Sequence, residues 1–415
     1  MIYPQLFVGI DIGKFKHVVA IVNEPKQVLG KVFDVAESQA GYQPRLAGLI
    51  KLEQLVRQYQ TKEFRLGMEA TGDYWKNLYH FLTRQAQAPS GAPAFVVTVI
   101  NPVQTKRFAQ SELRRAKTDA VNAIDIARFM VEKKPRPTVP RSETFDSIKD
   151  LDRQIHAVHK HQTMTLNKLR IELTKVAPEI EHHVALARHQ QVMVLLKHYP
   201  TAEAIAKASP AELRKLRYGK RRWQLSRPFI TKVQALAQNS IAHKTGPGAG
   251  LVVQALVEQF VQQHQMVTTL QAHLTELYQG VKERPSLLAT IPGIGPETAI
   301  ALEAYIGDVA RFAAAKKLVA YFGMNPTVNL SGIVTKRSGS LQKKGSAIVR
   351  HKLFMAVLSM ISNHVEPFYG YYQRLVAAGK PKLVAIGATM RKLVVIIYTM
   401  LKKQQPFQAQ KSLSS

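Results

Sequence analysis

The chain has 415 residues, of which 46% are hydrophobic and 21% are charged, as is ordinary for a folded protein with more than one domain. It contains no cysteine, which excludes disulfides, thiol catalysis and cysteine-ligated zinc and fits a reducing compartment. Its 58 lysines and arginines outnumber 28 acidic residues, and the formal net charge of +30 favours a polyanionic partner, above all nucleic acid.

The positive charge is most concentrated near the C-terminus. After Asp308 the chain has 17 lysines and arginines and one acidic residue, Glu366. Such a segment favours phosphate contacts, although packing against RNA or an anionic membrane surface is an alternative. No stretch of 18 apolar residues is free of charge and no signal peptide is apparent, so we expect a cytoplasmic protein with no membrane segment.

The first apolar run places an acid inside a strand. Residues 7–14 and 18–22 are rich in valine and isoleucine and predict two paired strands. Asp11 lies in the first strand, and a carboxylate there is costly to bury unless a cation or a donor meets it. Gly9 and Gly13 let a metal or a phosphate approach the backbone. The pattern therefore predicts a metal-binding or phosphate-binding acid.

Further strands and helices alternate up to residue 139. The expected elements are a third strand within 28–35, a helix over 42–59, a strand over 64–70, a helix over 74–82, a strand over 94–100, helical sequence around 106 and a helix over 118–132. Three strands in succession, followed by alternating helices and strands, predict an α/β domain with a mixed sheet over residues 1–139.

Four more residues of this domain have side chains that could share a metal with Asp11. They are Glu69 at a strand end and Asp119, Asn122 and Asp125 on a helix. Divalent cations such as Mg²⁺ take several oxygen ligands from different elements. Asp119 and Asn122 share a helix face, whereas Asp125 faces near Asn122 but is turned away from Asp119. Each acid also has a simpler reading: Asp119 and Glu69 as helix caps, and Asp11 as part of an actin-like phosphate loop.

Residues 140–284 follow a proline-rich linker and are expected to form a helical region. Apolar residues spaced by three and four cover 148–176, and a heptad stripe covers 256–281, with members at 256, 260, 263, 267, 270, 274, 277 and 281. These stripes predict two long helices that pair as a coiled coil, within the chain or across a dimer. An insert lies between them, at about 185–250.

The insert contains a basic and aromatic segment at 215–223. Lys220, Arg221 and Arg222 precede Trp223, and cations next to aromatic rings suit phosphate contacts together with base stacking. The alternative is a solvated turn with Trp223 in a local core.

Residues 285–402 are expected to form a mostly helical third domain, followed by a frayed tail over 403–415. Gly293 and Gly295 lie in a short turn before a helix, the pattern of a helix-hairpin-helix motif that holds duplex phosphates. A tight turn between helices is the alternative.

A serine-containing segment follows that turn. Ser331 precedes a series of cations at Lys336, Arg337, Lys343, Lys344 and Arg350. Serines among cations suit phosphate contacts, phosphorylation or a nucleophile. The residues alone favour a nucleophile least, because no histidine–acid pair is nearby, and a metal held by the first domain would have to replace that base.

Five blocks in order resemble the DEDD-type insertion-sequence transposases (insertion-sequence 110 family), which are relatives of the Piv DNA invertase. The blocks are residues 9–14 around Asp11; 68–72 around Glu69; 117–119 with 123 and 126–129, around Asp119; 291–295 with 306–308; and Ser331-Gly332 with 335–336, 345–346 and Arg350. The match spans both ends of the chain and leaves the insert uncovered.

The resemblance implies a RuvC-like (ribonuclease-H-type) first domain that holds Mg²⁺ or Mn²⁺ at Asp11, Glu69 and Asp119. It implies that Ser331 is the nucleophile that becomes linked to a DNA strand, within a dimer or tetramer whose subunits share active sites. It also implies double-stranded DNA and a non-coding bridge RNA as partners, in a prokaryotic cytoplasm next to the nucleoid.

One position departs from the family pattern. Asn122 stands where the family has its fourth acid; an asparagine carbonyl can ligate Mg²⁺ but adds no charge, and Asp125 is the substitute if the helix starts late or bends. We therefore expect a DNA transposase, with three alternatives: a RuvC-like nuclease that uses water, a protein that only binds DNA or RNA, and an actin-like kinase.

Overall fold

The computed structural model describes residues 3, 5–42, 58–85, 94–112, 118–139, 142–184, 190–244, 247–282, 284–326, 329–331, 334–336, 341 and 345–409. These residues form two compact units, Met1–Pro140 and Arg141–Ser415. Most of the expected helix over 42–59 lies outside the described residues.

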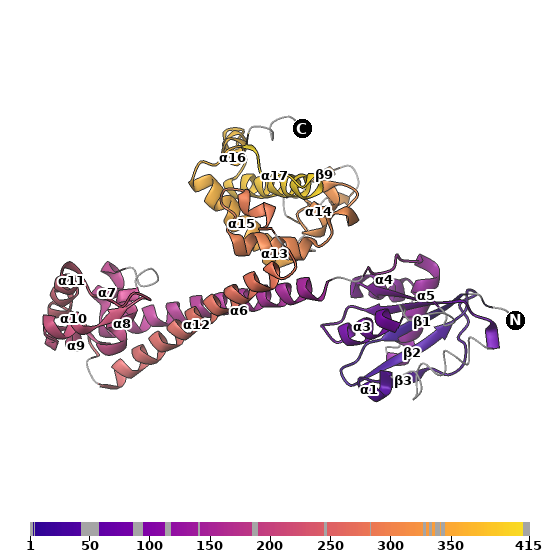
Figure 1. The fold of residues 1–415 in the computed structure, drawn as a ribbon, viewed down its shortest axis with the longest axis horizontal. Coiled ribbons are helices and arrows are strands. Elements are labelled where there is room, and N and C mark those ends of the chain that lie inside the picture. The colour runs from indigo at the N-terminus through magenta and orange to yellow at the C-terminus, as the bar shows by residue number, and fades with distance from the viewer. Residues whose placement is uncertain are drawn as a thin grey trace. The chain divides into compact units, whose positions relative to one another are not determined.

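The first unit is built on a mixed five-stranded sheet, as predicted (Figure 1). Its strands are β1 (Gln5–Asp11), β2 (Lys16–Val22), β3 (Phe33–Ala36), β4 (Glu63–Glu69) and β5 (Ala94–Ile100), in the order β3-β2-β1-β4-β5. The pairs β1–β2 and β2–β3 are antiparallel, while β4 runs parallel to both β1 and β5. The parallel centre brings the ends of β1 and β4 to the same edge.

Helices cover both faces of this sheet because its strands are buried on both sides. Leu6, Val8 and Ile10 of β1 pack in a core with α3 (Trp75–Gln85). Phe7, the intervening residue, packs in a second core with α4 (Pro102–Ser111) and α5 (Asp119–Lys133). The short helix α1 (Gln39–Tyr42) contributes Tyr42 to the first of these cores.

Two long antiparallel helices, α6 (Glu143–Val176) and α12 (Pro247–Gln279), form the frame of the second unit (Figure 1). The start of α6 packs on the end of α12 through Ile155 and Leu274, and the end of α6 meets the start of α12 through Leu169 and Val257. The two stripes therefore pair within one chain; supercoiling of the pair remains a prediction.

The heptad stripe is wrong at its last two positions. Leu277 and Val281 are 37% and 44% exposed, whereas Tyr278 is buried. A straight helix drifts away from a strict seven-residue repeat, so the buried face moves by one residue at Tyr278. Val281 also lies beyond the end of α12.

A helical lobe joins the two long helices. Its elements are α7 (Pro178–His183), α8 (Gln190–His198), α9 (Ala202–Lys207), α10 (Pro210–Lys215), the two-residue strands β6 (Arg217–Tyr218) and β7 (Trp223–Gln224), and α11 (Arg227–Gln238). All of these elements except β7 contribute residues to one apolar core, which they share with the adjoining ends of α6 and α12.

The C-terminal region is mainly helical, as predicted, and has its own core. Its elements are η2 (Leu287–Thr290), α13 (Pro296–Ile306), η3 (Val309–Arg311), α14 (Ala315–Tyr321), β8 (Asn329–Ser331), β9 (Val334–Lys336), α15 (Ala347–Ser362), α16 (Phe368–Ala377) and α17 (Lys382–Lys403). Phe407, in the expected frayed tail, stacks on Phe368 with ring centroids 6.0 Å apart.

The described helix α17 is long and apolar enough to cross a membrane by length and composition. Half of its most apolar window is buried inside the protein, where Leu393, Val394 and Ile397 belong to the C-terminal core. A core helix of this kind is weak evidence for a membrane span.

Candidate active site

Asp11 and Glu69 end neighbouring parallel strands. The register pairs Ile10 of β1 with Met68 of β4, so the next residue of each strand emerges at the same edge of the sheet. Both side chains are half-buried. The sheet therefore brings together two carboxylates that lie 58 positions apart in the sequence.

Helix α5 reaches this edge because Gly9 has no side chain. A Cβ at Gly9 would lie 2.0 Å from the carbonyl oxygen of Ala123 and 2.4 Å from the amide nitrogen of Ala127. Any other residue would push α5 off the strand, because both contacts are with backbone. Thr118 caps the helix by accepting a hydrogen bond from the Val121 amide.

The first turns of α5 face Asp11. The Nδ2 atom of Asn122 donates a hydrogen bond to Oδ2 of Asp11 at 3.1 Å. The pKa of Asp11 is raised to about 6, chiefly by burial; the hydrogen bond from Asn122 opposes this shift, and the charges of Asp119 and Glu69 add to it. The hydrogen bond from Asn122 therefore does not offset the burial of Asp11 and the nearby charges of Asp119 and Glu69.

Glu69 accepts a hydrogen bond from α4, a helix that the sequence analysis does not connect to the site. Thr105 of α4 is buried and donates its hydroxyl to Oε1 of Glu69. Thr71 lies 3.5 Å from Oε2 of the same carboxylate. The sequence contains only a weak signal for this contact: Asn101-Pro102 predicts the start of a helix, and Thr105 lies one turn into that helix.

Asp125 occupies a different environment. Its side chain is 6% exposed, on the buried side of α5, and Asn122 is the α5 side chain that contacts Asp11. Within the described part of the chain, no three histidine, aspartate or glutamate side chains converge closely enough to hold a metal by themselves.

The donor set nevertheless fits a hard divalent cation in kind. Asp11, Glu69 and Asp119 offer carboxylate oxygens and Asn122 an amide oxygen, the ligands that Mg²⁺ and Mn²⁺ prefer. Burial is the main cause of the raised pKa of Asp11, and the neighbouring carboxylates Asp119 and Glu69 add to it; a bound cation would lower this pKa again.

Ser331 belongs to the second unit. It is the last residue of β8, and its backbone pairs with Val334 of the antiparallel strand β9. Lys336 is the last residue of β9, while Arg337, Lys343 and Lys344 lie outside the described residues.

Two other expected phosphate contacts of this unit have packing roles. The guanidinium of Arg350 donates to the carbonyl oxygens of Gly345 at 2.6 Å and Phe322 at 3.3 Å. Gly293 has φ +93°, and a Cβ there would lie 2.9 Å from Met360, so a tight turn alone requires glycine. The element before that turn is the single 3-10 turn η2, rather than the full helix of a helix-hairpin-helix motif.

The N-terminus of α13 is compatible with an anion contact. Gly295 is its N-cap and has no side chain to accept hydrogen bonds from the first amides of the helix.

The predicted basic and aromatic segment forms a turn in the helical lobe. The exposed residues Lys220, Arg221 and Arg222 lie on the turn between β6 and β7. Trp223 is 55% exposed, which excludes the alternative that it fills a local core.

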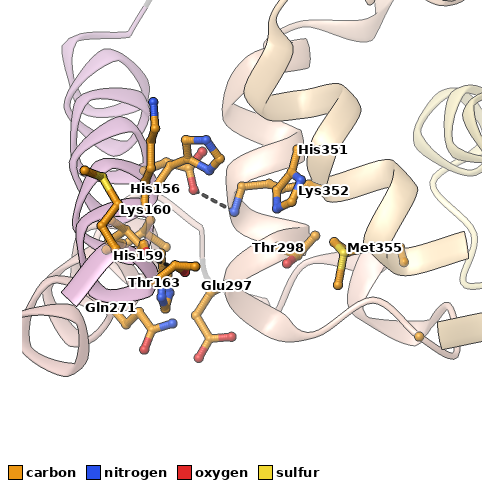
Figure 2. Close-up of a pocket in the computed structure, with 16 residues that line it drawn as sticks. His156, His159, Lys160, Thr163, Gln271, Glu297, Thr298, His351, Lys352 and Met355 are labelled. Carbon is orange, nitrogen blue, oxygen red and sulfur yellow. Dashed lines mark hydrogen bonds and ion pairs between the residues drawn. The ribbon is translucent and has the colours of Figure 1, made fainter. Parts of the chain in front are cut away.

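A groove of about 600 Å³ lies where α6 and α12 meet α13 and α15. Figure 2 shows His156 of α6 facing His351 and Lys352 of α15, and Glu297 of α13 lines the same groove. Lys352 forms an ion pair of 2.8 Å with Asp152, whose side chain is 2% exposed. This pair ties the long helix to the C-terminal region.

Comparison with known proteins places the chain in a family. Residues 8–178 match the DEDD transposase model of the IS110 group, and residues 285–373 match the model of the IS116/IS110/IS902 transposase family. The chain belongs to the IS110 family of transposases. A DEDD transposase domain implies a RuvC-like fold, in agreement with the mixed sheet and the position of its acids.

Individual relatives agree with this assignment. The pilin gene-inverting protein of Moraxella lacunata is 26% identical over 352 residues, which are 84% of this chain and 83% of the relative. An insertion element IS110 protein of Streptomyces coelicolor is 27% identical over 311 residues, 72% of this chain and 73% of that protein. An insertion element IS116 protein of Streptomyces clavuligerus is 20% identical over 411 residues, 98% of this chain and 96% of that protein.

Proposed function

We propose that this IS110-family transposase cuts and rejoins DNA strands by transesterification through a serine–DNA intermediate. The observation that carries the proposal is the gathering of Asp11, Glu69 and the start of α5 at one edge of a RuvC-like sheet. Oxygen donors at the ends of neighbouring strands are a suitable platform for phosphoryl transfer.

The acidic edge is the half of the site that binds the cation. Asp11, Glu69 and Asp119 would hold Mg²⁺ or Mn²⁺, with Asn122 as a neutral fourth ligand. The cation would neutralise charge on the phosphate and favour ionisation of the attacking hydroxyl. Thr105 positions Glu69, and Asn122 orients Asp11.

Ser331 supplies the other half. Its Oγ attacks phosphorus, a bond from Oγ to phosphorus forms, and one backbone oxygen leaves as a hydroxyl after taking up the proton that serine releases. The bond energy is kept in the serine ester, so a second DNA hydroxyl can reverse the step and seal a new junction. Ser331 is the last residue of β8, so it lies at a strand end, as Asp11 and Glu69 do in the first unit.

The remaining proposals concern partners and organisation. Residues 1–139 form the catalytic domain, 140–284 a coiled-coil region with an insert at about 185–250, and 285–402 the transposase domain, with a tail to 415. Gly295, Lys336, Arg337, Lys343 and Lys344 belong to the surface that meets double-stranded DNA, and Gly293 and Arg350 also contribute to it by holding its local packing. Two or four copies assemble in the cytoplasm near the nucleoid, and a bridge RNA guides the choice of DNA.

A suicide DNA substrate tests the proposal. A nick placed beside the cleavage site lets the released fragment diffuse away, so the covalent protein–DNA adduct accumulates and is counted on a denaturing gel. We expect the adduct with the wild-type protein and Mg²⁺, and none with Ser331→Ala or Asp11→Asn. Ser338→Ala, a serine in the same basic segment, is the matched control and should keep the adduct.

The alternatives give different results in the same assay. Strand cleavage that persists in Ser331→Ala without an adduct would identify a nuclease that uses water. DNA binding without cleavage by any variant, wild type included, would identify a protein that only binds.

A further inference from the structure

The lobe between the two long helices carries a small β-hairpin. Its strands β6 and β7 are antiparallel, and Tyr218 pairs with Trp223 across them. Gly219 and Arg222 adopt positive φ angles of 72° and 52°, and the Arg222 amide bonds to the Gly219 carbonyl at 3.1 Å. This turn holds three consecutive cations at the tip.

The two aromatic residues of the hairpin have different environments. Tyr218 is half-buried and packs against the core of the lobe, so it anchors the hairpin. Trp223 keeps 55% of its surface in solvent. An exposed indole is unusual, because burying a tryptophan side chain stabilises a fold through its large apolar area. A solvent-exposed indole ring beside a basic turn therefore indicates a binding site for a planar group such as a base.

The cations around Trp223 are available to a ligand. Lys220, Arg221 and Arg222 are exposed, and none makes an ion pair with any described residue. Arg217, by contrast, is occupied: it donates to the carbonyl oxygens of Arg214, Lys215 and Leu216 at 2.7, 2.8 and 3.2 Å. The tip therefore offers three free cations, and Arg217 stabilises its base.

The surrounding sequence has no acid that could neutralise the tip locally. No aspartate or glutamate occurs between Glu212 and Glu258. The segment also lies outside both family matches, which end at residue 178 and resume at 285. The family assignment therefore does not account for this hairpin.

We propose that the hairpin binds an unpaired stretch of nucleic acid, with one base stacked on Trp223 and the neighbouring phosphates on Lys220, Arg221 and Arg222. The proposal rests on nucleic acid being the substrate of this chain. An indole face needs a free base face, which an intact duplex covers by its own stacking. Duplex phosphates alone would engage the cations but leave Trp223 in water.

Tryptophan fluorescence measures the contact directly. The chain has only two tryptophans, so Trp75→Phe leaves Trp223 as the single emitter. We expect single-stranded RNA or DNA to quench this emission and a blunt duplex of the same length to leave it nearly unchanged. Stronger quenching by RNA than by DNA of the same sequence identifies an RNA as the natural ligand, and the reverse identifies an exposed DNA strand.

Substitution at Trp223 separates stacking from charge. We expect Trp223→Ala to weaken binding of a labelled single strand by about tenfold and Trp223→Phe to retain most of the affinity. Lys220→Gln should lower the dependence of affinity on salt, with the slope of log affinity against log salt reduced by about 0.7. Because Lys220 and Trp223 are both exposed, these changes should leave thermal unfolding nearly unchanged.

Three results would overturn the proposal. They are equal quenching by single strands and blunt duplex, unchanged single-strand affinity in Trp223→Ala, and a smaller assembly of Trp223→Ala in light scattering at unchanged affinity, which would make the hairpin a protein contact. Failure of the proposed recombination shows separately, as a missing Ser331 adduct, and leaves Trp223 quenching unaffected.

Discussion

The amide of Asn122 donates a 3.1 Å hydrogen bond to the carboxylate of Asp11, across 111 positions of sequence. The family resemblance leads us to expect an acid at position 122, and the residue in contact with Asp11 there is neutral. It also joins the first strand to the helix that completes the acidic edge, so the identity of residue 122 affects both charge and positioning.

Asn122→Asp should make the first unit more dependent on a divalent cation. The change replaces a donor by a carboxylate facing Asp11 and should cost about 1–3 kcal/mol of stability without metal. With Mg²⁺ present the extra charge should strengthen binding and so raise the melting temperature more than in the wild type. Thermal unfolding at increasing Mg²⁺ concentrations measures both effects.

Asn122→Ala is the control for the lost hydrogen bond. It should be destabilised without the added response to Mg²⁺. The same Mg²⁺ response in all three proteins would show that residue 122 is not part of a cation site.

Two glycines paired across β1 and β4 should differ in their tolerance of alanine. Gly9→Ala would drive a Cβ into the backbone of α5 and should cost about 3 kcal/mol or more. Gly67→Ala meets only side chains, chiefly Met130 at 2.6 Å, which can move, and should cost about 1 kcal/mol. Urea unfolding of the two variants measures the difference, and equal losses would contradict the close packing of α5 on β1.

Breaking the buried ion pair between Asp152 and Lys352 should lower the free energy of unfolding far more than breaking an exposed pair. Asp152→Ala leaves a charge without its partner in the groove and should cost about 3–5 kcal/mol. The pair Lys197–Glu258, at 3.3 Å with both side chains half exposed, is the matched control, and Glu258→Ala should cost about 1 kcal/mol or less.

A double-mutant cycle checks this comparison. Asp152→Leu combined with Lys352→Met should recover much of the loss, because no charge is then left buried. If the double variant is as unstable as Asp152→Ala, the loss comes from packing rather than from the charge.

The first unit should lose stability as the pH falls below about 6.5, the ordinary pKa of histidine, because of His17. This side chain is fully buried, with Nε2 2.5 Å from Glu37 and 2.9 Å from the hydroxyl of Tyr42. Burial lowers the pKa of His17 more than Glu37 raises it. The unfolded chain therefore takes up a proton before the folded one, and each pH unit should cost at most about 1.4 kcal/mol.

His17→Gln keeps a polar group but cannot titrate. Urea unfolding between about pH 5 and pH 7.5 should show a flatter dependence in this variant than in the wild type. The pKa of Glu37 is also lowered, since hydrogen bonds from Tyr42, Asn77 and His17 outweigh its burial, so its own contribution is lost only at lower pH. Parallel pH profiles would contradict a neutral buried His17.

Local patterns were sufficient to predict the strands of the first unit and the two acids at their ends. The alternation of Leu6, Val8 and Ile10 with Phe7 and Gly9 reports burial on both faces, and parallel neighbours align their carboxyl ends. The distant contacts were not predictable in this way. Thr105 reaches Glu69 because α4 packs on the sheet through Phe108, which the local pattern does not show.

The sequence by itself determined the composition of this protein's chemistry: an acidic strand end, a basic C-terminal third, a family-specific order of blocks and two apolar stripes. Periodicity and charge are local properties, so the chain displays them before it folds. Tertiary structure decided which groups meet and which are left free. Packing placed Asn122 on Asp11, buried Tyr278 in place of Leu277, engaged Arg350 with backbone carbonyls and left Trp223 in solvent, because each outcome depends on the distance between segments remote in the chain.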